Sequence, residues 1–104
     1  MIFDDLDFFI LGKIYDEDIT TWEIAKEYFK NTDSVKLNYK HQLIKRRLEK
    51  MEKIGLIFIE GNRNKRKKYL LVEDNILFGK HKFPNGYRDA ILIKESGKWM
   101  VFQI

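Results

Sequence analysis

Residues 45–60 read KRRLEKMEKIGLIFIE, and the spacing of their apolar side chains changes partway along. Up to Gly55, apolar residues recur at the three- and four-residue intervals of a helix with one buried face. After Gly55 they form a short run rich in isoleucine, which is typical of a strand. A glycine at this junction suits the left-handed conformation that ends many helices. We therefore predict a helix over residues 39–54 and a strand over residues 56–60.

Two further helices are predicted upstream. The first covers residues 5–15, where leading aspartates suit the positive end of the helix dipole. The second covers residues 21–29 and begins with the pattern of a capping box, TTWE. Residues 31–38 are polar and indicate a turn, and Asn38 is a suitable N-cap for the third helix. We expect the side chain of Trp22 to lie in the core.

The rest of the chain is predicted to be extended. The expected strands cover residues 68–73, 76–82, 87–94 and 98–104. Residues 61–67 read GNRNKRK and form a turn dense in positive charge. The predicted fold is α+β: three helices and a hairpin, followed by a C-terminal antiparallel β-meander over residues 76–104. We expect residues 1–104 to form a single domain.

The expected β-meander is apolar on both faces. In its last strand, Trp99 and Val101 fall on one face and three other apolar residues on the opposite face. Strands of this kind must be covered on both sides. The helical part of the chain can cover one side, and a second copy is the simplest cover for the other. We therefore expect a homodimer; the alternative is a monomer that folds the meander into its own core.

Positive charge is concentrated in the middle of the chain. The whole chain carries a net charge of +4. Residues 1–23 hold seven acidic side chains and one lysine, whereas residues 35–68 hold twelve lysines or arginines and three glutamates. Such a separation makes a polyanionic partner worth testing.

The composition excludes several kinds of site. Because the chain has no cysteine, it can form no disulfide, thiolate metal site or cysteine nucleophile. Its two histidines, His41 and His81, lack the spacing of metal ligands. No apolar run reaches the roughly 18 residues of a membrane span, and the acidic N-terminal segment is unlike a secretory signal. We expect an intracellular, cytoplasmic protein without a metal or other cofactor.

Three stretches of the chain, taken in order, resemble the winged helix-turn-helix of small prokaryotic transcription regulators. They are TTWEIAKEYF (residues 20–29), HQLIKRRLEKMEKIGLIFIE (residues 41–60) and the basic hairpin that follows. The resemblance covers residues 4–73. It implies that residues 39–54 are the recognition helix and that the hairpin of residues 56–73 is the wing. It also implies sequence-specific binding of double-stranded DNA by a repressor-like transcriptional regulator that is not an enzyme.

The resemblance further implies which side chains contact DNA. Near the start of a recognition helix, side chains read base edges in the major groove. In this chain they are Tyr39, Lys40, Gln42, Lys45 and Arg46. A wing places cations on phosphates or in the minor groove. In this chain they are Arg63, Lys65, Arg66, Lys67 and Lys68. The chain departs from the family in its predicted turn over residues 30–38, which is longer than the usual three or four residues.

Other interpretations of the charged residues are open. The basic wing could dock an acidic protein, which would make the domain a protein-interaction module. Asp4, Asp5 and Asp7 could bind Mg²⁺ in a nuclease, but the start of a helix also favours negative charge. Arg47 projects beside the apolar face of its helix, which favours a structural ion pair or a snorkelling side chain over a contact with DNA.

Overall fold

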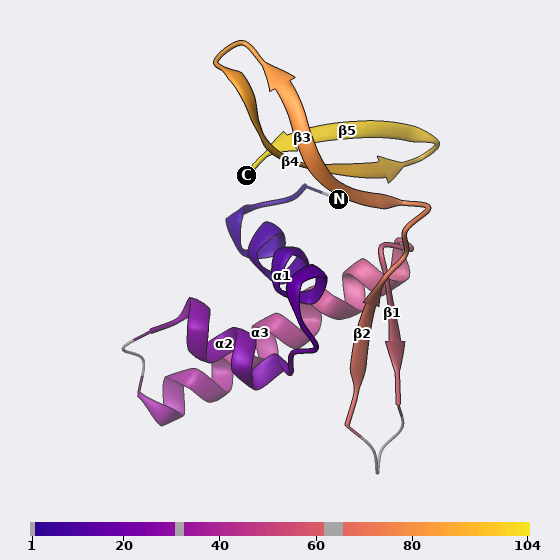
Figure 1. Cartoon of the computed structure of the whole chain (residues 1–104). Coiled ribbons are helices and arrows are strands. Elements are labelled where there is room, and N and C mark those ends of the chain that lie inside the picture. Colours follow the sequence, from indigo (N-terminus) through magenta and orange to yellow (C-terminus); the bar gives the residue numbers. More distant parts are fainter. Residues whose placement is uncertain (1, 31–32, 62–65) are drawn as a thin grey trace.

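The computed structural model describes residues 2–30, 33–61 and 66–104, which form three helices and two antiparallel sheets (Figure 1). The helices are α1 (Asp5–Asp16), α2 (Thr21–Tyr28) and α3 (Ser34–Lys53). The first sheet consists of β1 (Ile57–Glu60) and β2 (Lys68–Leu71). The second has the order β3 (Ile76–Phe83), β4 (Gly86–Glu95) and β5 (Lys98–Gln103). The predicted α+β class is therefore confirmed. None of the helices in these ranges is long and apolar enough to cross a membrane.

The helix ends follow from local sequence. At the start of α1, Asp4 and Asp7 form a reciprocal capping box, and Thr20 and Glu23 do the same for α2. Each pair satisfies two backbone N–H groups that have no partner within the helix. Gly55 has a φ of +84° and ends α3 as the sequence predicts. The N–H groups of Gly55 and Leu56 donate hydrogen bonds to the carbonyl oxygens of Glu52 and Met51 in the last turn of the helix, as in a Schellman motif.

The start of α3 differs from the prediction. The predicted helix begins at Tyr39, with Asn38 as the N-cap, but α3 begins at Ser34. Its N-cap is Asp33, whose carboxylate accepts a hydrogen bond from the N–H of Lys36 (2.9 Å). The long turn predicted before this helix is therefore wrong, because only residues 29–33 connect α2 to α3.

Helix α1 lies between the other two helices and the three-stranded sheet (Figure 1). Aromatic side chains join α1 to that sheet: Phe8 contacts Phe102 at a ring-centroid distance of 5.0 Å, and Tyr15 stacks on Phe78 at 4.4 Å. A single cluster of buried apolar side chains runs through the helices and both sheets. Its fully buried members include Ile10, Leu11, Ile24, Ile44, Leu48, Met51, Leu56, Ile57, Ile91 and Ile93.

The three-stranded sheet is covered on one face only. Its inner face carries Phe78 and Phe102, which pack against α1. On the outer face, Leu77, Leu92 and Val101 lie side by side across the three strands. Leu77 and Val101 are exposed, as is Trp99 in the same strand as Val101. The apolar character of both faces, which the sequence predicts, thus leaves an apolar outer surface.

Candidate functional site

The solvent-facing side of α3 is the main polar surface of the helical part. Ile44, Leu48 and Met51 anchor the opposite side of α3 in the core. Exposed residues recur on the solvent side every three or four positions, which places them in one stripe along the helix. They are Val35, Asn38, Tyr39, Gln42, Arg46 and Glu49. The stripe offers amide, phenol and guanidinium groups over more than three helical turns.

A cleft of about 200 Å³ lies where α2, α3 and β2 meet. It brings Lys45 of α3 together with Arg66 and Lys67, which precede β2. Cationic side chains from two distant parts of the sequence therefore surround one small space. The remaining lining residues are Thr20, Thr21, His41 and Tyr69. Thr20 and Thr21 belong to the start of α2, whose helix dipole favours negative charge.

Arg66 is held beside this cleft by acidic groups. Its guanidinium lies 3.1 Å from a carboxylate oxygen of Asp18 and 3.3 Å from the backbone carbonyl oxygen of the same residue. The carboxylate of Glu23 is 3.8 Å away. Arg66 and both acids are about half exposed. Exposed ion pairs are worth about 0–1 kcal/mol, so an incoming anion can displace them at low cost.

Trp22 does not lie in the core, contrary to the prediction. Its side chain is 41% exposed and stacks on His41 of α3, with ring centroids 4.5 Å apart and an interplanar angle of 11°. His41 is half-buried rather than fully on the surface, and its Nε2 shares a hydrogen bond with Oγ1 of Thr21 (2.6 Å). Burial lowers the pKa of His41 below its usual range, and the charge of Lys45 lowers it further.

Trp22 borders a shallow groove on the first half of α3. The other lining residues of this groove are Val35, Asn38 and Tyr39. Val35 and Tyr39 are 69% and 74% exposed. Val35 and Asn38 were expected in a turn and not on the recognition helix, because the predicted helix begins at Tyr39. An N-cap at Asp33 would have included both.

The predicted site residues are divided among several places. Lys45, Arg66 and Lys67 line the cleft, and Tyr39 lines the groove beside Trp22. The ammonium group of Lys40 lies 4.9 Å from the ring centroid of Phe29. Gln42 is exposed between these features, Arg46 is exposed farther along α3, and Lys68 is exposed in β2. Arg63 and Lys65 lie outside the described residues.

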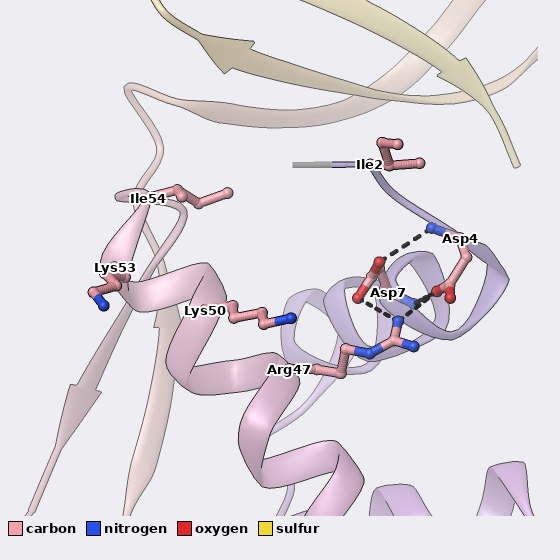
Figure 2. Close-up of a pocket in the computed structure, with 7 residues that line it drawn as sticks. All are labelled: Ile2, Asp4, Asp7, Arg47, Lys50, Lys53 and Ile54. Carbon is pink, nitrogen blue, oxygen red and sulfur yellow. Dashed lines mark hydrogen bonds and ion pairs between the residues drawn. The ribbon is translucent and has the colours of Figure 1, made fainter.

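An ion-pair network fixes the second half of α3 to the start of α1. Figure 2 shows Arg47 reaching from α3 to Asp4 and Asp7, at N–O distances of 2.7 Å and 3.0 Å. They line a surface pocket of about 480 Å³ into which Lys50 also points. The structural ion pair predicted for Arg47 is therefore confirmed.

The pKa values of the two carboxyl groups in this network are shifted in opposite directions. The hydrogen bond from Arg47 lowers the pKa of Asp4 to about 2. Burial raises the pKa of Asp7, although Asp7 also accepts hydrogen bonds from the Asp4 N–H and from Arg47. Asp4 and Asp7 also cap α1, so their structural role explains their positions and no bound ligand is needed to do so. No group of three or more His, Asp or Glu side chains with the geometry of a metal site occurs within residues 2–30, 33–61 and 66–104.

Comparisons with known proteins do not assign the chain to a family. No family model, no curated protein and no solved structure matches it. The function must therefore be argued from the geometry of α3, the cleft and the hairpin.

Proposed function

We propose that the protein binds double-stranded DNA sequence-specifically, as a repressor-like transcriptional regulator of the winged helix-turn-helix type. In this proposal α3 is the recognition helix and the β1–β2 hairpin is the wing. The observation that carries the proposal is the cleft in which Lys45 of α3 meets Arg66 and Lys67 of the hairpin. It adjoins the exposed stripe of α3, so groups that suit phosphates lie beside groups that suit base edges.

The early start of α3 changes which residues are best placed to read bases. The first turns of a recognition helix enter the major groove most deeply. Gln42 and Arg46 remain candidates, with Asn38 now on the same side of the helix. An amide can pair with adenine and a guanidinium with guanine. Val35 can contact the methyl group of thymine, because it is apolar and exposed near the start of α3.

Phosphate contacts are assigned to the cleft and to the cations beside the groove. Lys45, Arg66 and Lys67 would hold one phosphate, assisted by the start of α2. Arg66 would exchange its contact with Asp18 for that phosphate. Lys40 and Lys68 would contact neighbouring phosphates. Contacts of this kind set the register of the protein on DNA without reading its sequence.

One observation favours the alternative of a protein-interaction module. Trp22, Val35 and Tyr39 line an exposed, largely aromatic groove, and Trp22 stacks on His41, which lines the cleft. Aromatic side chains are enriched where proteins bind proteins. If the wild-type protein binds an acidic peptide but does not bind duplex DNA, this second function is supported over the first.

The proposal is tested by titrating a fluorescent duplex of mixed sequence at several salt concentrations. We expect the logarithm of affinity to fall with the logarithm of salt, with a slope of about −0.9 for each phosphate neutralised. The double substitution Arg66→Ala and Lys67→Ala should weaken binding to all duplexes alike. It should also reduce the steepness of that slope by an amount that corresponds to roughly one to two phosphate contacts.

A matched control separates local contacts from total charge. The double substitution Lys82→Ala and Lys94→Ala removes the same charge from exposed positions of the three-stranded sheet. We expect it to leave the slope nearly unchanged. Absence of binding even at low salt would refute the DNA proposal, and equal effects of the two double variants would refute the assignment of the cleft.

A further inference from the structure

The two edges of the three-stranded sheet differ in charge. The strand order β3-β4-β5 leaves β3 at one edge and β5 at the other. The outer half of β3 carries Lys80, His81 and Lys82. Lysine in an edge strand prevents another strand from adding to the sheet. In β5, by contrast, the only charged residue is Lys98, at the start of the strand.

The free edge of β5 offers a regular row of backbone groups. Lys98 pairs with Glu95 across a two-residue turn, and the N–H of Ile104 bonds to the carbonyl of Asp89 in β4. In an antiparallel strand, successive residues direct their backbone groups to opposite sides. Trp99, Val101 and Gln103 therefore direct their N–H and C=O groups away from β4. No backbone hydrogen bond from elsewhere in the described ranges reaches them.

The side chains around this edge are apolar on both faces. On the outer face, Val101 ends the row that begins with Leu77 and Leu92, and both Val101 and Leu77 are exposed. On the inner face, Phe102 contacts Phe3 and Phe8. All three phenylalanines remain partly exposed. An added strand would therefore gain hydrogen bonds and cover apolar surface above and below the sheet.

We propose that β5 pairs with β5 of a second copy, antiparallel and centred on Val101, to make a continuous six-stranded sheet. This register places Trp99 opposite Gln103 of the second copy and Met100 opposite Phe102, so no like charges meet. The outer row then continues through the two-fold axis, from Leu77, Leu92 and Val101 to the same residues of the partner. The dimer does not depend on DNA binding, and its test contains no DNA.

The occupant is a second copy because the register is self-complementary. Val101 directs its backbone groups to the free edge, so it can exchange two hydrogen bonds with itself across a two-fold axis. A charged partner would find no opposite charge along β5 after Lys98. Two copies of the helical part would then be related by the same axis, as binding to a palindromic site requires.

The first test measures mass by sedimentation equilibrium. We expect the wild type to be a dimer and Val101→Lys to raise its dissociation constant by roughly tenfold or more, because two lysines would face each other. Leu77→Lys is the matched control, since it adds the same charge to the same face of the sheet but lies in β3, two strands away from Val101. It should leave the dimer in place. A monomeric wild type would overturn the proposal, as would equal loss of dimer in both variants, which would indicate face-to-face packing.

A second test avoids adding a charge and uses the absence of cysteine from the chain. Val101→Cys should be cross-linked efficiently by a short bismaleimide, because the two sulfur atoms lie about one strand spacing, roughly 5 Å, apart. Leu77→Cys should not, because its two positions are about five spacings, roughly 24 Å, apart. Efficient cross-linking of Leu77→Cys, or none of Val101→Cys, would contradict the pairing.

Discussion

The two halves of α3 differ in their burial and in their contacts with the rest of the molecule. In the second half, Arg47 is bonded to Asp4 and Asp7 of α1, and Leu48 and Met51 are buried. In the first half, Val35 and Tyr39 are among the most exposed large side chains of the protein. The difference teaches how one long helix can be fixed by the fold and still expose side chains to solvent. The helix is fixed at one end, and its other end is exposed.

The largest expected effect comes from breaking the fixed half. Arg47→Met should destabilise the protein by about 3 kcal/mol at pH 7, because it leaves the buried carboxylate of Asp7 without its cation. Burial already raises the pKa of Asp7. A carboxyl group whose pKa is raised in the folded state makes the protein less stable as the pH rises through that pKa. The loss of stability caused by Arg47→Met should therefore be smaller at pH 4.

This prediction is measured by urea unfolding at both pH values. Arg46→Met is the matched control: Arg46 is the neighbouring residue, is exposed and makes no ion pair within the described ranges. Its effect on stability should stay within about 0.5 kcal/mol. Equal stability of the two variants would show that the network does not fix α3.

The next effect concerns the exposed stripe of α3. Gln42→Ala and Arg46→Ala should each reduce discrimination between the preferred duplex and a mismatched one by roughly 1–3 kcal/mol. Stability should not change, because both side chains are exposed. Competition titrations with paired duplexes measure the effect. A loss that is the same for every duplex would assign these residues to phosphates instead of bases.

The smallest effect concerns the pH dependence of the network. The pKa of Asp4 is lowered from 3.8 to about 2, chiefly by its hydrogen bond from Arg47. Its contribution to stability is therefore full above about pH 4 and lost as the pH falls towards 2. Asp4→Asn should reduce stability at pH 5, and the gap to the wild type should close as pH falls. A gap that stays constant from pH 5 to pH 2 would contradict this role of the Asp4 carboxylate.

Most of the fold could be predicted from local signals. The capping boxes at Asp4 and Thr20 and the glycine at position 55 each impose a backbone requirement that few residues meet. The start of α3 could not be placed in this way, because both Asp33 and Asn38 are good N-caps. The half-buried Leu37 decides between them: with Ile44 and Met51 it forms a seven-residue repeat on one face of the helix.

The site was harder to predict than the fold. Trp22 is large and apolar, so sequence alone favours the core, whereas its stacking on His41 depends on how α2 packs against α3. The cleft joins residues 20–21, Lys45 and residues 66–67, and no local pattern brings these together. The charge separation along the sequence is not a separation in space, because Arg47 contacts Asp4 and Asp7, and Arg66 contacts Asp18 and Glu23.

We propose above all that the exposed stripe of α3 reads DNA bases. Selection of bound fragments from random duplex DNA tests it most directly, with the wild type and the triple variant Asn38→Ala, Gln42→Ala and Arg46→Ala in parallel. We predict that the wild type enriches a defined motif and that the triple variant still binds DNA but enriches none. Fragments without a common motif for the wild type, or the same motif for both proteins, would contradict the account.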